Sequence, residues 1–168
     1  MTEWSDRASE ERSLLNPSFG ATLLWQAAFG HQTESSAGGA GLPFETAFLI
    51  LPMVLHREMR ESLPRSVATS LAVWTANIPL ARSQIADRAH LLVPFTKEAM
   101  TFGGIRGGLS FSKGAMTANE AWRRKLSMVF KECSDEVQEC GSRAEFVGRW
   151  VARTGSGDTV MSILGVRP

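Results

Sequence analysis

The side chains best suited to catalysis or metal binding in this sequence are three histidines and two cysteines: His31, His56, His90, Cys133 and Cys140. A structural zinc site needs about four nitrogen or sulfur ligands around one ion, and no histidine here stands at such a spacing from another ligand. A cysteine nucleophile also needs a base and an orienting group, and the adjacent sequence supplies neither. We therefore expect no metal, no cofactor and no enzymatic activity. An enzyme with a pocket around His56 or Cys133 is the least favoured alternative.

The two cysteines also indicate a compartment. If both lie on one helix, their separation in the sequence corresponds to about 10 Å along the axis, which is too far for a disulfide. Unpaired cysteines are typical of a reduced, cytoplasmic protein. Residues 1–13 are polar and of mixed charge, unlike a secretory signal, and no apolar run reaches the roughly 20 residues that span a bilayer. We predict a cytoplasmic protein without a membrane segment.

A glycine-rich stretch, GGIRGG over 103–108, has a superficial likeness to a phosphate-binding loop. Such loops follow a strand and are followed by a Lys-Ser/Thr pair, and this stretch has neither. We interpret it as a turn between a helix over 96–102 and a β-hairpin over 109–117, which is the one credible hairpin in the sequence.

That order of helix and hairpin is also the order of a winged-helix unit, in which the helix enters the major groove and the hairpin contacts phosphate. The candidate DNA contacts are Arg106 and Lys113, and no acidic residue lies between Gly103 and Asn119. Two basic residues make a small electrostatic footprint, and a formal net charge of +1 does not indicate nucleic-acid binding. DNA binding is therefore an alternative hypothesis rather than the main one.

Two further segments place charges at helical spacing. Basic and acidic residues alternate over 56–65, where Arg57 and Arg60 are candidates for partner docking. Arg149 lies on a second charged stripe, opposite Trp150. A solvated helix face with internal ion pairs is the favoured interpretation of the first segment, and a docking patch is the alternative. The second is either plain surface or interface.

Length and composition indicate one globular domain. The chain has 168 residues, of which 43% are hydrophobic and 21% charged. It can therefore bury one core without the help of disulfides or a structural metal. We expect a flexible N-terminal arm over 1–13 and a single helical domain over 14–168. The predicted fold is mainly α, a compact helical domain of roughly eight helices with one small β-hairpin. A winged-helix-like second half is an option within it.

Local signals place the first helices. Asn16 and Pro17 predict a helix start with a side-chain cap, and Gly30 predicts its end. The segment 42–55 is apolar on nearly every side, which predicts a buried helix kinked at Pro52. Further helical stripes follow over 66–76 and 79–92 and after the hairpin.

The end of the chain is unusually apolar. Chain ends are normally loose and polar, whereas here an apolar stretch leads directly into Arg167 and Pro168. We predict that this end docks onto the chain's own core or onto a partner. The candidate docking residues are therefore Arg57, Arg60, Arg149, Leu164, Val166, Arg167 and Pro168.

An ordered set of short phrases carries a family resemblance. The phrases are Asn16-Pro17 with Leu23-Leu24-Trp25, Gly41-Leu42-Pro43-Phe44, Phe48-Leu49-Ile50-Leu51-Pro52 with Leu55-His56, Leu63-Pro64 with Thr69-Ser70-Leu71, Arg88-Ala89 with Val93-Pro94-Phe95-Thr96-Lys97-Glu98-Ala99, Gly148-Arg149-Trp150, and Leu164-Gly165-Val166-Arg167-Pro168. Together they resemble the small middle component of bacterial three-component ABC systems, the group that includes Lamassu-type anti-phage and anti-plasmid defence. The resemblance covers about residues 14–168.

The resemblance implies a non-catalytic adaptor subunit. Such a subunit would bridge an SMC/Rad50-like ABC ATPase, which senses DNA, and an effector that is often a nuclease. DNA would then be reached indirectly, through the complex. The family offers no established catalytic residues to transfer. The alternative from a different class is a winged-helix-type DNA-binding protein that uses the helix over 96–102 and the hairpin over 109–117.

Overall fold

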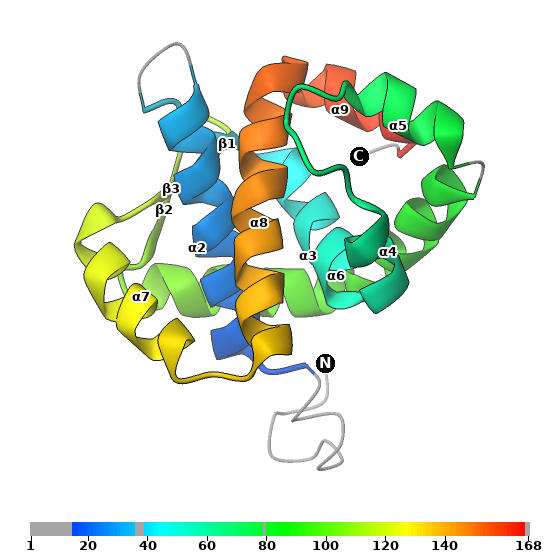
Figure 1. Cartoon of the computed structure of the whole chain (residues 1–168). Coiled ribbons are helices and arrows are strands. Elements are labelled where there is room, and N and C mark those ends of the chain that lie inside the picture. Colours follow the sequence, from blue (N-terminus) through cyan, green and yellow to red (C-terminus); the bar gives the residue numbers. More distant parts are fainter. Residues whose placement is uncertain (1–14, 36–38, 79, 167–168) are drawn as a thin grey trace.

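The structure is a computed structural model that describes residues 15–35, 39–78 and 80–166, so the expected arm over 1–13 lies outside the described residues. It is mainly helical with a small antiparallel sheet, which confirms the predicted fold class (Figure 1). The elements, in chain order, are α2 (Pro17–Glu34), β1 (Leu42–Pro43), the 3₁₀ helix η2 (Phe44–Thr46), α3 (Ala47–Leu55), α4 (Arg57–Ser62), α5 (Leu71–Asn77), α6 (Ala81–Ile105), β2 (Leu109–Ser112), β3 (Ala115–Ala118), the 3₁₀ helix η3 (Glu120–Trp122), α7 (Arg123–Lys131), α8 (Asp135–Thr154) and α9 (Gly157–Leu164).

Helix α2 is the hub of the molecule. It begins as predicted, because the Asn16 side chain accepts a hydrogen bond of 2.9 Å from the backbone N–H of Ser18 and Pro17 occupies the first turn. Helices α8 and α6 and strand β3 all pack against it. In Figure 1, α2 and α8 run side by side through the centre. Since it is covered from several directions, α2 buries residues around its whole circumference.

The predicted end of α2 at Gly30 is wrong, because the helix continues to Glu34. Gly30 allows α8 to approach closely and does not end the helix. A Cβ built there would run into the backbone carbonyl of Glu145 on α8, and a Cβ on Gly148 of α8 would run into the carbonyl of Ala27 on α2. Each helix thus lacks a side chain where the other's backbone passes, and α2 and α8 touch backbone to backbone.

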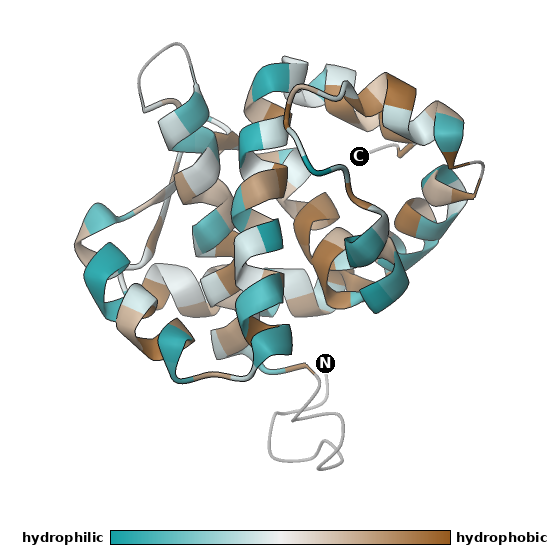
Figure 2. Cartoon of the chain, in the orientation of Figure 1, coloured by the Kyte–Doolittle hydropathy of each residue, from teal (hydrophilic) through white to brown (hydrophobic). Residues whose placement is uncertain are grey.

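The apolar segment 42–55 is a helix only from Ala47 onward. Its first residues instead form strand and 3₁₀ helix, since Leu42 and Pro43 pair with Met116 and Ala115 of β3. A proline at a sheet edge loses no ladder hydrogen bond, which fits this placement. Helix α3 is hydrophobic along most of its length (Figure 2) and is almost completely buried, as predicted. Pro52 lies inside it.

Helix α6 corrects the predicted boundaries around 96–102. One helix runs from Ala81 to Ile105, so the helices predicted over 79–92 and 96–102 are joined into one, and Thr96 is a buried interior residue. Pro94 removes one backbone donor, but His90, whose carbonyl loses that donor, lies on the exposed side. Water can therefore hydrate the free carbonyl, and the helix continues.

The predicted hairpin is confirmed, with β2 and β3 joined by a two-residue turn. Lys113 and Gly114 hold that turn with φ values of 50° and 72°, the positive-φ pair that matches the twist of a tight hairpin. The sheet order is β1-β3-β2, so β1 from far earlier in the chain adds a third strand. No helix among the described residues is both long and apolar enough to cross a bilayer.

The backbone contact between α2 and α8 yields a first prediction. Gly148→Ala should lower the free energy of unfolding by about 2–3 kcal/mol, because the methyl group meets backbone that cannot rotate away. Gly104→Ala in α6 is the matched control, since its Cβ would stand an ordinary 3.4 Å from the mobile ring of Phe111. The control should be neutral or gain up to about 1 kcal/mol from helix propensity. Thermal unfolding of both variants by circular dichroism measures this, and equal stabilities would contradict the close contact.

Candidate docking surface

The apolar end of the chain docks onto its own core. Helix α9 closes at Gly165, a left-handed residue with φ 70°, and the N–H of Val166 donates to the carbonyl of Met161 at 3.0 Å. Leu164 is 1% exposed and Val166 is also buried. Of the two possibilities that the sequence left open, the structure shows the intramolecular one for these residues. Arg167 and Pro168 lie outside the described residues.

Arg57 and Arg60 occupy opposite environments, which corrects the expectation that they share one docking face. Arg57 is exposed and pairs with Glu61 one helical turn away, at 2.8 Å. Arg60 is 1% exposed and reaches α8, where its Nε lies 3.1 Å from Glu139 and its Nη2 lies 3.2 Å from Glu136. Its Nη1 donates to the carbonyl of Val54 at 2.9 Å. Arg60 therefore ties α4 to α8 and is not accessible to a partner.

Arg149 takes part in a second link between helices. With Arg153 it holds Glu34, the last residue of α2, and the Nε of Arg149 lies 2.8 Å from the carboxylate. Hydrogen bonds from Arg149 and then Arg153 hold the pKa of Glu34 below its usual value. Arg149 stays partly exposed. Its first role is to fasten α8 to the end of α2.

The two candidate DNA contacts lie at opposite ends of the hairpin. Arg106 follows α6, with its guanidinium 5.3 Å from the centroid of the Phe102 ring. Lys113 is exposed at the hairpin tip. The four residues of β2 between them extend about 13 Å at the usual rise per residue. The structure thus does not bring Arg106 and Lys113 together.

The histidines and cysteines have local structural roles where contacts are defined. Burial lowers the pKa of His31, whose Nδ1 lies 2.9 Å from the carbonyl oxygen of Ala40. The Nδ1 of His56 accepts from the N–H of Met59 and so caps α4, while its Nε2 faces Arg88. Burial raises the pKa of the Cys140 thiol, which donates to the Val54 carbonyl. Across the described ranges, no group of His, Cys, Asp or Glu gathers around a possible metal position.

The sequence patterns predicted a helical stripe after the hairpin but not the positive charge of the helix that forms there. Helix α7 carries Arg123, Arg124, Lys125 and Lys131, all exposed, and has no acidic residue. Leu126 is the only buried residue of this helix. Met128 and Val129 are 59% and 51% exposed, so part of the apolar side of α7 faces solvent.

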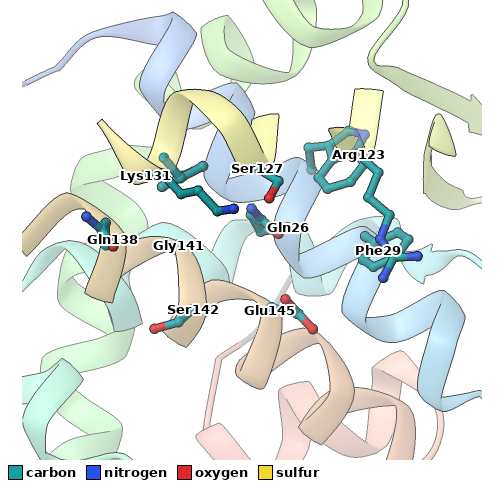
Figure 3. Close-up of a pocket in the computed structure, with 11 residues that line it drawn as sticks. Gln26, Phe29, Arg123, Ser127, Lys131, Gln138, Gly141, Ser142 and Glu145 are labelled. Atoms are coloured by element: carbon teal, nitrogen blue, oxygen red, sulfur yellow. The ribbon is translucent and has the colours of Figure 1, made fainter. Parts of the chain in front are cut away.

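Helix α7 lies between two hollows. The first, of about 370 Å³, separates α7 from α2 and α8 and is lined by Phe29, Arg123, Phe130, Lys131 and Glu145 among others. Figure 3 shows Arg123 above Phe29 and Lys131 reaching toward Gln26. The second, of about 320 Å³, lies on the other side of α7, and its lining includes Phe102, Arg106, Trp122, Lys125 and Val129.

Trp25 of α2 lines both hollows. Its indole N–H donates to the carbonyl of Asn119 at 3.1 Å, and its ring stacks on Phe29 with centroids 5.1 Å apart. We call α7 together with these two hollows the α7 surface.

Two of the α7 cations are held over aromatic rings. Arg123 lies 5.0 Å from the centroid of Phe29, and Lys125 lies 5.0 Å from that of Trp122. Such contacts are worth about 0.5–1 kcal/mol at exposed sites, and they fix the charge without neutralising it. In the described part of the chain, none of the four α7 cations, nor Arg106, forms an ion pair. The surface is therefore positively charged, partly apolar and without a counter-charge on α7 itself.

The positive charge of this surface is visible in the sequence. Three consecutive basic residues at 123–125 stand in a segment without acidic residues from Ala121 to Lys131. The apolar stripe of the same segment, which indicates a helix packed on the core, draws attention away from that charge. The hollows leave no comparable mark, since Trp25 and Phe29 come from a helix about a hundred residues earlier.

Comparison with known proteins gives one match. A family model described as ABC-three component (ABC-3C) system Middle Component 3 matches residues 4–168. The match spans nearly the whole chain. No curated protein and no solved structure matches.

The contrast between Arg57 and Arg60 yields a second prediction. Arg60→Met should lower the free energy of unfolding by about 1–3 kcal/mol, because it removes a buried cation with charge-assisted hydrogen bonds. Arg57→Met should change it by less than about 0.5 kcal/mol, since an exposed ion pair contributes little. Urea unfolding of both variants measures the difference. Equal effects would show that Arg60 is not the link between α4 and α8.

Proposed function

We propose that this chain, which belongs to the middle component 3 family of ABC-three component systems, is a non-catalytic adaptor. In this proposal it bridges an SMC/Rad50-like ABC ATPase and an effector nuclease in a cytoplasmic bacterial complex. The complex would act against phages or plasmids. DNA would be contacted by the complex and reach this subunit indirectly.

The observation that carries the proposal is the extent of the family match. It covers residues 4–168, so the entire described fold corresponds to a middle component of a multi-subunit system. A component that lies between two others needs an interaction surface. The α7 surface supports that role. It combines cations that form no ion pair within the described ranges with exposed apolar side chains and open hollows.

The proposed docking residues therefore differ from those expected from the sequence. Arg60, Leu164 and Val166 are buried within the chain and contribute to its stability. Arg57 and Arg149 retain exposed surface and remain proposed contacts. Arg167 and Pro168 also remain proposals, outside the described residues. The α7 surface is an additional proposed contact with a partner.

DNA binding through the helix and hairpin has less support. The turns of α6 at 96–102 bury Thr96, Ala99 and Met100, and Arg106 and Lys113 lie apart. A recognition helix needs an exposed face whose side chains reach base edges together with nearby phosphate contacts. The adaptor proposal therefore takes precedence, and DNA binding is retained as an outcome of the test below.

The adaptor role predicts stable assembly. When the tagged chain is co-expressed with the other two components of its system, both should co-purify, and native mass spectrometry should give one complex with defined stoichiometry. Co-expression with each component singly is the control that identifies direct contacts. A lone monomer that retains neither component would contradict the proposal. Steep salt-dependent binding of that monomer to duplex DNA would favour the alternative.

A further inference from the structure

Among the described α-helices, α7 has the smallest share of buried residues. It buries Leu126 and presents Met128 and Val129 to solvent. Isolated apolar residues on a surface are ordinary, but here they stand beside two hollows lined by aromatic rings. The site is therefore concave on both sides of α7 and apolar along part of its ridge.

The charges of this site select an anionic occupant. Arg123 and Lys131 line the first hollow, and Arg106 and Lys125 line the second. Arg124, which lies between Arg123 and Lys125 in the sequence, is exposed on α7. The carboxylate that faces them from the linings is Glu145 in the first hollow. Four lining cations against one lining carboxylate leave an excess of positive charge that an acidic partner would neutralise.

The apolar part of the site favours a protein over duplex DNA. Contacts to the phosphates of a duplex need cations alone, whereas Val129 and the rings of Phe130 and Trp122 offer apolar surface that the apolar side chains of an amphipathic helix can cover. A helix with its side chains is about 10 Å across, so we expect anchors on the two sides of α7 to lie about that far apart. Residues seven positions apart on one helix face are separated by about 10 Å along the axis.

We infer that the α7 surface binds an acidic amphipathic helix of a partner subunit. This helix crosses α7, places one apolar side chain in each hollow, and sets carboxylates against Arg123, Arg124 and Lys125. The inference rests on the proposed function, because the helix belongs to another component of the complex.

The direct test uses a synthetic probe and the whole chain. The probe is a fluorescent helical peptide of about 18 residues with two leucines seven positions apart and glutamates on the same face. A matched peptide carries lysines in place of the glutamates. Fluorescence anisotropy should show binding of the glutamate peptide that weakens with salt, and no binding of the lysine peptide. Equal binding of both peptides, or of neither, would overturn the inference.

Variants locate the binding site. Arg123→Glu combined with Lys125→Glu removes one cation from each hollow and should weaken glutamate-peptide binding at least about tenfold. Arg65→Glu combined with Arg82→Glu changes the same number of exposed cations outside α7 and should leave binding unchanged. Arg124→Glu, whose side chain has no ring contact among the described ones, tests the same surface if the double variant unfolds. Unchanged binding in a folded α7 variant would overturn the inference.

Two further measurements separate the possible outcomes. Val129→Ser should weaken the peptide severalfold. Tighter binding of a duplex DNA of about 20 base pairs, unaffected by Val129→Ser, would instead identify a phosphate-binding surface and overturn the inference. Co-purification of the double variant with the other components tests the α7 inference separately from the adaptor role. If wild type assembles and the double variant assembles equally well, the α7 inference fails and the adaptor role stands; if wild type does not assemble, the adaptor role itself fails.

Discussion

The backbone contact between α2 and α8 is the constraint on which the rest of the structure depends. Gly30 and Gly148 face the opposite backbone at two points of the same helix pair, so the two axes approach more closely than side chains would allow. Gly20 of α2 makes room for side chains of α6, since a Cβ there would press on Ala99 and Phe95. With α2 held from several directions, the rings of Trp25 and Phe29 are fixed in place. Trp25 lines both hollows beside α7, and Phe29 lines the first.

Two groups of cations in the chain have different roles. Arg60 at one end of α8, and Arg149 with Arg153 at the other, are paired with carboxylates and join helices. Asp135 and Glu136 lie in the first turn of α8 and Arg153 lies in its last turn, which also suits the helix dipole. The second group lies on α7 and at Arg106. Arg106, Arg123 and Lys125 contact aromatic rings, and no cation of this group forms an ion pair among the described residues. The first group stabilises the fold, and the second is available for a partner.

Sequence patterns predicted the features that depend on neighbouring residues. The cap at Asn16, the buried segment of α3 and the turn at Lys113 and Gly114 are all local in origin. Glycine at position 30 is ambiguous by contrast, since it marks a helix end or a close approach, and only the arrival of α8 decides between them. The break expected between 79–92 and 96–102 is absent for a related reason. Pro94, which lies between the two ranges, is on an exposed helix face, where a proline is tolerated.

The candidate site was less predictable than the fold. Arg57 and Arg60 look alike in sequence, yet one faces solvent and the other faces Glu136 and Glu139, which come about eighty residues later. The basic run of α7 was visible, but its meaning depends on hollows that Trp25 and Phe29 complete from the other end of the chain.

Hydrogen–deuterium exchange of the chain, alone and within its complex, tests the central claim most directly. The claim is that α2 and α8 form a rigid framework, whereas the α7 surface is open to a partner in the isolated chain. The account predicts that the buried turns of α2 and α8 exchange slowly in both states, whereas residues 120–131 exchange readily alone and become protected in the complex. Protection that leaves 120–131 unchanged and appears on another face would contradict it.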